Sequence, residues 1–232
     1  MVLLTVALVA PVCGGTITGT VRAEGKTGMD SDASGGKYDS RKFKFAERVN
    51  YAEMRDFVVY LVGPVGTNNS LPEKPAQVIT TKKVSQRGAM FSPHVLPVVA
   101  GTTVEWPNYD EILHNVFSIT SGATFDLGLY GEGGSAEYTF KTPGLALINC
   151  NVHQAMQANV LVLDTPYFGH PDKDGQFQLD VPAGAGKLMV WHPRAAIQTT
   201  LIAAPTADPL ALRLVLTKPR VVQHLNKEHK VY

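Results

Sequence analysis

Short runs of β-branched and aromatic residues, separated by glycine and proline, recur along most of the chain. Phe57 to Val62 (FVVYLV) is a continuous apolar run, and Gly15 to Arg22 alternates apolar with small or polar residues, as a half-buried strand does. Similar runs predict strands at 78–83, 89–91, 95–99, 102–106, 115–119, 136–141, 145–150 and 158–163. Because Gly63-Pro64 and Pro143-Gly144 punctuate them as turns, the pattern predicts an all-β sandwich or barrel.

A second, smaller β-module is expected after Pro166. Asp174-Gly175 lies between two apolar runs, which is a strong hairpin signal, and further strands are predicted at 177–181, 187–192, 199–204 and 210–217. We therefore expect a main domain over 15–165, a β-module over 166–217 and a basic tail over 218–232. A polar stretch at 24–56 is interpreted as an insertion in the main domain, with one short helix near 45–54.

The first residues read MVLLTVALVAPVCGG and carry no charge between Val2 and Val12. The run is too short to span a membrane and is typical of the apolar part of a secretory signal, so residues 1–14 are predicted to be a signal peptide with a truncated basic start. A buried first strand and a lipoprotein anchor at Cys13 are the alternatives. If the signal is removed, Cys150 is the only thiol that remains, because the chain has two cysteines.

Composition excludes several classes of protein. The chain has 232 residues, 44% of them hydrophobic, which is enough for a folded core. Its formal net charge of +1 gives no support to bulk nucleic-acid binding. The charge is uneven, however, because residues 101–165 contain seven acids and a single base, Lys141.

The chemistry concentrates in Cys150-Asn151-Val152-His153-Gln154-Ala155-Met156, which has the spacing C-x2-H-x2-M. Another imidazole, His114, lies upstream in LHNVFS, just before a predicted strand. Thiolate, imidazole and thioether ligands together select copper, and two histidines with a cysteine and a distant methionine are typical of a blue-copper site. No catalytic sequence motif of a hydrolase or phosphate-binding enzyme is present.

The segments VVAGTTVEWPN, HNVFS and YTFKTPGLALINCNVHQAM resemble the cupredoxins, the plastocyanin, azurin and amicyanin group, over roughly 57–164. The resemblance implies a Greek-key β-sandwich with one type 1 copper at one end. It implies that His114, Cys150, His153 and Met156 are the ligands and that Asn115 ties the two ligand loops together. The whole chain is similar to bacterial methylamine-utilisation or plastocyanin-like proteins, with DKDGQFQLDVPAGAGKLMVWHP resembling a carboxypeptidase regulatory-like module.

Other conspicuous side chains have plainer interpretations. His94 and His192 lie at predicted strand ends, and we expect surface or hydrogen-bonded roles for them, with a second metal site as the alternative. His170, Asp172 and Asp174 lack the pattern of a calcium loop and predict a turn. The apolar side chains of FDLGLYGEGG alternate imperfectly. We expect them to fill the core, with a cover over the copper end as the alternative; they are Phe125, Leu127, Leu129 and Tyr130.

These observations predict a periplasmic or secreted copper protein that carries single electrons and is not an enzyme. Its expected partners are redox proteins, a dehydrogenase on one side and a cytochrome or oxidase on the other, with no nucleic acid and no membrane span. Electrons would pass through the edge of His153, beside an apolar patch at Val152 and Ala155. A copper carrier or storage protein is the alternative, followed by a structural adhesion module, and a copper enzyme would need extra ligands such as His94 and His192.

Overall fold

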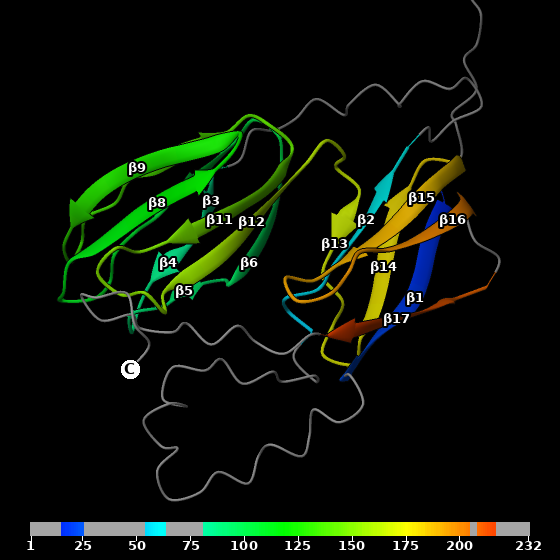
Figure 1. Cartoon of the computed structure of the whole chain (residues 1–232). Helices are drawn as coiled ribbons and strands as arrows, with labels where there is room; N and C mark the ends of the chain where they lie inside the picture. The colour runs from blue at the N-terminus through cyan, green and yellow to red at the C-terminus, as the bar shows by residue number, and fades with distance from the viewer. Residues whose placement is uncertain (1–14, 26–53, 64–80, 205–207, 217–232) are drawn as a thin grey trace, which may run out of the picture.

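The computed structural model describes residues 15–25, 54–63, 81–204 and 208–216, and these ranges are all-β (Figure 1). Their strands form two β-sandwiches that lie side by side. We call residues 81–165 the central domain. We call the other sandwich, made from residues 15–25, 54–63 and 166–216, the composite module. The expected all-β fold class is confirmed, and none of the described segments forms a helix with the length and hydropathy needed to cross a bilayer.

The central domain packs a five-stranded sheet against a three-stranded sheet and a short hairpin. The larger sheet has the order β6 (Val95–Val99), β12 (Gln157–Leu163), β11 (Gly144–Asn149), β8 (His114–Thr120) and β9 (Ala123–Tyr130). The smaller sheet has the order β10 (Glu137–Phe140), β7 (Thr102–Glu105) and β3 (Lys82–Lys83), and the hairpin pairs β4 (Ser85–Gln86) with β5 (Phe91–Ser92).

Strand alternation explains which side chains form the core of the central domain. In β11, Ala146 and Ile148 point inward and are buried, whereas Leu147 between them faces outward and is half exposed. Trp106 is fully buried, and its ring packs edge-on against Phe91 at 5.7 Å between centroids. Each fully buried side chain of this size contributes roughly 1.5–3 kcal/mol, so the core holds the loops at the end of the sheet in place.

The composite module combines both ends of the chain. One sheet has the order β14 (Gln176–Val181), β1 (Gly15–Gly25) and β17 (Leu210–Leu216). The other has the order β13 (Phe168–Gly169), β2 (Val58–Val62), β15 (Gly184–Trp191) and β16 (Gln198–Ala204). β1 is the centre of its sheet, antiparallel to β14 and parallel to β17, and the core between the sheets includes Ile17, Val21 and Leu61.

This pairing corrects the expected assignment of the first two strands to a main domain over 15–165. β1 and β2 pair with strands of the 166–217 segment, and Phe57 lies in the core of the composite module. Strand pairing over so long a separation leaves no local trace in a sequence, which is why alternation alone predicted the strands but not their partners. Residues 26–53, which contain most of the polar stretch and of the expected helix, lie outside the described ranges, as do the proposed signal peptide, Cys13 and the basic tail.

The expected turn at Asp174-Gly175 is confirmed, but it does not close a hairpin within one sheet. The Asp172 carboxylate accepts the backbone N–H groups of Asp174 and Gln176 at 2.9 and 2.8 Å. Gly175 adopts a positive φ of 79°. The strands on either side, β13 and β14, belong to different sheets, so this turn crosses from one layer of the composite module to the other.

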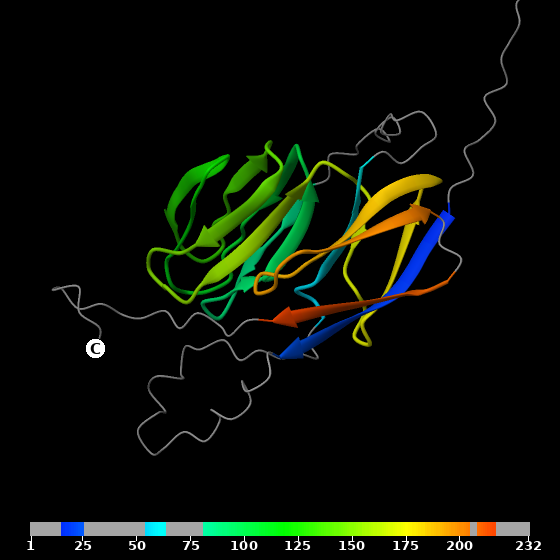
Figure 2. The ribbon, with the colours of Figure 1, turned by 45° about the vertical axis from the view of Figure 1, so that its right-hand side comes forward.

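An apolar interface joins the two sandwiches, which remain adjacent when the molecule is turned (Figure 2). Val95, Leu161 and Leu163 on the outer face of the large central sheet pack against Val58, Tyr60 and Trp191 of the composite module. All six side chains are buried, so water is excluded from this contact.

Candidate metal centre

The sheet brings three potential ligands to one end of the central domain. His114 is the first residue of β8, and Cys150 directly follows the last residue of β11. Because β8 and β11 are antiparallel neighbours, the start of one and the end of the other lie at the same edge. His153 comes from the short loop that connects β11 to β12, so the tight spacing C-x2-H returns its ring toward Cys150.

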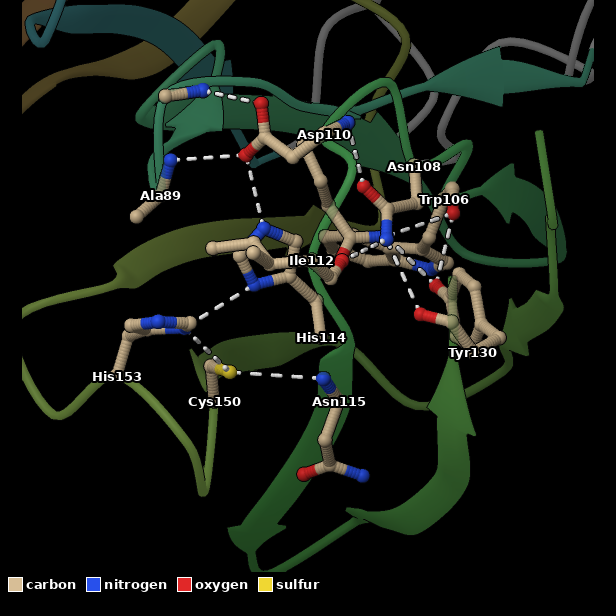
Figure 3. A network of polar contacts seen from close by, with 12 residues as sticks. Ala89, Trp106, Asn108, Asp110, Ile112, His114, Asn115, Tyr130, Cys150 and His153 are labelled. Carbon is tan, nitrogen blue, oxygen red and sulfur yellow. Dashed lines mark hydrogen bonds and ion pairs between the residues drawn. The ribbon is translucent and has the colours of Figure 1, made fainter. Parts of the chain in front are cut away.

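The ligand atoms of His114, Cys150 and His153 all lie within 4.8 Å of one another, and this is the only such group of three within the described ranges. The two Nδ1 atoms are 3.2 Å apart, and Cys150 Sγ is 4.0 Å from His153 Nδ1 (Figure 3). Metal–nitrogen and metal–sulfur bonds of about 2.0–2.3 Å in one plane would separate ligand atoms by about 3.5–4 Å. One copper ion therefore fits this donor set in both size and chemistry.

Asp110 holds the His114 ring in the orientation that metal binding needs. The Nε2 atom of His114 is 2.8 Å from the Asp110 carboxylate, and His114 is fully buried. Since the carboxylate accepts the hydrogen on Nε2, the lone pair of His114 Nδ1 faces Cys150 and His153. A metal ion there would displace the hydrogen that the two Nδ1 atoms share.

Asp110 is itself held by a tight turn. The backbone N–H groups of Gly88 and Ala89 donate to its carboxylate at 2.7 and 2.9 Å, and both residues have positive φ values of 64° and 54°. Successive N–H groups turned toward one point form an anion-binding concavity. The Ala89 N–H bond does most to lower the pKa of Asp110 to about 2, with Gly88 and His114 acting in the same direction against burial. Asp110 therefore stays ionised at any working pH.

The backbone and side chain of Asn115 meet both ligand loops. Its N–H donates to Cys150 Sγ at 3.5 Å, and its side-chain oxygen accepts the N–H of Asn151 at 3.4 Å. Its amide nitrogen donates to Asp126 at 2.7 Å and to the Gly128 carbonyl at 3.0 Å. These hydrogen bonds fix the cysteine sulfur and the residue after it relative to β8 and β9.

Met156 is buried in the core cluster that also contains Cys150. Its backbone N–H donates to the His153 carbonyl at 2.8 Å, which closes the ligand loop as a turn. The loop is therefore pinned at both ends, by Asn115 near Cys150 and by this turn at Met156.

A buried polar network supports the loop that carries Asp110. The Gln86 amide donates to the Trp106 carbonyl and to Tyr130 Oη, and Tyr130 Oη donates to the same carbonyl at 2.8 Å. Asn108 donates from its side chain to the carbonyls of Ile112 and Tyr130, both at 3.0 Å. Burial raises the pKa of Tyr130 to about 12, and the Cys150 sulfur acts in the same direction, so the phenol stays neutral.

Two residues of the site were not expected from the sequence. Asp110 precedes His114 by four positions, and an acid at that spacing is the one local signal that could have marked it. Gln86 lies on the short strand β4, 20 residues before Trp106, and no spacing rule predicts a bond between them.

His94 and His192 do not join the candidate metal centre. His94 is bonded to Asp56, and His192 Nδ1 accepts the backbone N–H of Arg194 at 3.1 Å. The expectation of hydrogen-bonded roles is therefore confirmed for both. Among the four side chains expected in the core, Phe125, Leu127 and Tyr130 do pack against it, whereas Leu129 is 60% exposed on β9, so that expectation was wrong for Leu129.

Apolar side chains are exposed beside the ligands. Val152 is 50% exposed within the ligand loop, Leu113 is 55% exposed just before His114, and Ala155 is also exposed. The His153 ring is partly exposed among them, whereas His114 is enclosed. Of the two ligand imidazoles, His153 is therefore the one that is accessible from this surface.

Comparison with known proteins gives structural likenesses only. No family model matches the chain, and no curated protein matches it. Among solved structures, the chain is similar to a purple cupredoxin from Nitrosopumilus maritimus, with 28% identity over 35% of this chain and 99% of that one, at a TM-score of 0.32. It is similar to a mutant amicyanin in its reduced state, with 20% identity over 40% of this chain and 97% of that one, at a TM-score of 0.34.

A third likeness is to a copper-containing nitrite reductase from Thermus scotoductus SA-01, with 26% identity and a TM-score of 0.35. It covers 44% of this chain but only 25% of the reductase, so the chain spans about a quarter of that enzyme's length. The site itself brings one buried cysteine sulfur and two imidazoles together at one end of an all-β domain.

Proposed function

We propose that the chain is a type 1 copper protein that carries single electrons between redox partners. The observation that carries this proposal is the convergence of His114, Cys150 and His153 at distances that suit one copper ion. Copper bound there would supply a Cu(II)/Cu(I) couple. Met156 is proposed as a weak additional ligand because it closes the same loop and is buried with Cys150.

The protein's contribution is to hold the ligands still. Asp110 fixes His114, Asn115 N–H donates to the Cys150 sulfur, and the turn at Met156 fixes the loop. A donor set that cannot rearrange favours electron transfer, because neither oxidation state requires the ligands to move far. Turnover of a substrate at copper would need open coordination positions or extra ligands. His94 and His192, which could have supplied such ligands, bond to other groups.

Electrons would pass through the partly exposed His153. The surrounding side chains Val152, Ala155 and Leu113 offer a small apolar contact for a redox partner such as a dehydrogenase, cytochrome or oxidase. The acidic balance of residues 101–165 favours basic partners and a docking rate that falls with added salt.

A periplasmic or secreted location is part of the proposal and rests on the apolar run at Val2 to Val12. A lone thiol such as Cys150 is exposed to oxidation in that compartment, and a bond to copper protects it.

Spectroscopy of the copper-loaded chain tests the proposal. We expect an intense visible absorption from the bond between cysteine sulfur and copper, a small copper hyperfine coupling in electron paramagnetic resonance and reversible reduction. Cys150→Ser should abolish the visible band, and Gln154→Ser, at an exposed position of the same loop, is the matched control that should keep it. A colourless copper form would overturn the proposal, and a coloured form that cannot be cycled would indicate a copper carrier or storage protein.

A further inference from the structure

The histidines of the described ranges form two groups. His114 and His153 lie at the candidate metal centre, and the other three, His94, His170 and His192, lie around a single carboxylate, Asp56. Asp56 lies just before β2 of the composite module, whereas His94 belongs to the central domain. The second group therefore lies where the two sandwiches meet.

The closest contact in this group crosses the interface. His94 Nδ1 is 2.7 Å from Asp56 Oδ2, and the two side chains are partly buried, with 29% and 19% of their surface exposed. The His94 carbonyl accepts the N–H of Asn159 in β12 at 2.8 Å, and the side chain of Asn159 lies 3.5 Å from His94 Nε2. Asp56 is thereby connected to the strand that begins directly after Met156.

The other two imidazoles belong to the composite module. His170 Nδ1 donates to the Phe57 carbonyl at 2.8 Å, and the His192 ring packs on the Phe57 ring at 4.5 Å between centroids. His192 is only 6% exposed, and its Nδ1 accepts the Arg194 N–H, which is the pattern of a neutral imidazole. Arg194 adds a positive charge near the same ring.

Within the described residues, Asp56 is the carboxylate that acts on His192, and His94 already pairs with it at 2.7 Å. A proton on the buried His192 ring would add a positive charge beside that pair, close to Arg194 and at the edge of an apolar contact. Uncompensated charge in such a place is costly, and separating the sandwiches would let water reach it.

We propose that Asp56, His94, His170 and His192 form a proton-sensitive joint, which holds the two sandwiches together at neutral pH and releases them on acidification. The joint goes beyond the proposed electron transfer, because it controls how the composite module sits on the central domain. The first proton keeps the joint closed through the pair of His94 with Asp56. The second proton opens it.

The titration behaviour of the group agrees with this order. Burial lowers the pKa of His192 to about 4, with Arg194 and His94 lowering it further and Asp56 opposing them. Burial raises the pKa of Asp56, but the hydrogen bond and charge of His94 outweigh it, so its pKa lies below the usual value. Burial and the charge of Asp164 raise the pKa of Tyr60 in the interface, so this phenol stays neutral. Asp56 therefore stays ionised in the range in which His192 takes up its proton.

This group is not a second ready-made metal site. His114, Cys150 and His153 are the only described residues whose ligand atoms gather as closely as a metal requires. The side chains around Asp56 are instead joined in pairs to one another and to backbone groups.

The two tryptophans make the joint measurable. Trp191 is buried in the interface, and Trp106 is buried in the core of the central domain. In a Trp106→Phe chain, the emission of Trp191 should shift to the red between about pH 6 and 4, while far-UV circular dichroism stays unchanged. Small-angle scattering of the unsubstituted chain, which needs no folded variant, should show a larger radius of gyration over the same range.

Two substitutions test whether this acid-induced separation of the sandwiches arises from the proposed joint. His192→Phe keeps a ring against Phe57 but takes up no proton, so the midpoint should fall by about one pH unit or more. Asp56→Asn removes the counter-charge, so the midpoint should rise by a similar amount. Asp180→Asn is the matched control, because Asp180 bonds to Thr16 within the composite module and away from the interface.

The proposal is overturned if the emission of Trp191 and the radius of gyration change only when the circular dichroism is lost, or if His192→Phe leaves the midpoint unmoved. These readouts follow domain contact and not copper, so they stand or fall independently of the proposed electron transfer.

Discussion

The orientation of His114 depends on one side chain, Asp110, which lies outside the C-x2-H-x2-M spacing. The carboxylate accepts the hydrogen of His114 Nε2 and is held in turn by two backbone N–H groups. Three hydrogen bonds thus position the Nδ1 atom of His114. Two run from the Gly88 and Ala89 N–H groups to Asp110, and the third joins Asp110 to His114 Nε2. Loss of a side chain that bonds to a metal ligand in this way typically lowers metal affinity by about 10- to 100-fold.

Asp110→Asn should weaken copper binding by about 10- to 100-fold, because the neutral amide cannot both orient the ring and balance its charge. Competition against a chelator of known affinity measures the change. Glu111→Gln is the control, since the neighbouring Glu111 side chain is exposed. Equal affinities of the two variants would contradict the role of Asp110.

Met156→Leu separates packing from ligation at the same position. The side chain is almost fully buried, and a swap of similar volume should cost less than about 1.5 kcal/mol of unfolding free energy. If the thioether is a ligand, the visible band of the copper form should shift while the fold remains. An unaltered spectrum in a stable variant would show that Met156 is only a core residue.

At the scale of the strands, β1 determines how the composite module is assembled. β1 lies between β14 and β17, and at Gly19 the neighbouring atoms are too close to accommodate a side chain. A Cβ added at Gly19 would lie 2.5 Å from the Leu210 carbonyl oxygen and 2.7 Å from the Phe177 ring. Glycine is needed there because two neighbouring strands approach it, and not because of an unusual backbone angle.

Gly19→Ala should therefore destabilise the composite module by roughly 1–3 kcal/mol, as overpacking does elsewhere. Urea unfolding followed by the emission of Trp191 measures this effect. Gly169→Ala in β13 is the matched control, because its added Cβ would make an ordinary contact of 3.5 Å with Leu179. Equal losses in the two variants would show that crowding at β1 is not the cause.

At the scale of the whole molecule, stability should depend on pH through His192. Burial lowers its pKa from 6.5 to about 4 while the two sandwiches are in contact, so between these values the unfolded chain binds a proton that this closed folded form does not. This contribution is complete above about pH 6.5 and is lost as the pH falls toward 4. It amounts to at most about 3 kcal/mol.

Urea unfolding at pH 7 and at pH 4.5 checks this dependence. The unfolding free energy of the unsubstituted chain should fall between the two, and His192→Phe should reduce the fall because no proton is taken up at that position. An equal fall in both chains would mean that other groups cause it. Asp56 does not contribute in this window, since its lowered pKa affects stability only below about pH 4.

The sequence by itself determined the local features of this protein. Alternation and turn residues predicted most of the strands, and the spacing of Cys150, His153 and Met156 marked one loop with a copper-selective donor set. Such features depend on residues within a few positions of one another, so they can be read directly from the chain.

Only the tertiary structure decided which distant segments of the chain lie next to one another. The pairing of β1 and β2 with C-terminal strands, the cradle of Gly88 and Ala89 around Asp110, and the three imidazoles around Asp56 all join segments far apart in the chain. Alternation of apolar and polar residues predicts that a strand has a buried face, but it does not predict which strand packs against that face. The sequence around an isolated histidine likewise does not predict which carboxylate it will contact. Long-range packing makes those choices, and in this protein it positions the ligands and joins the two sandwiches.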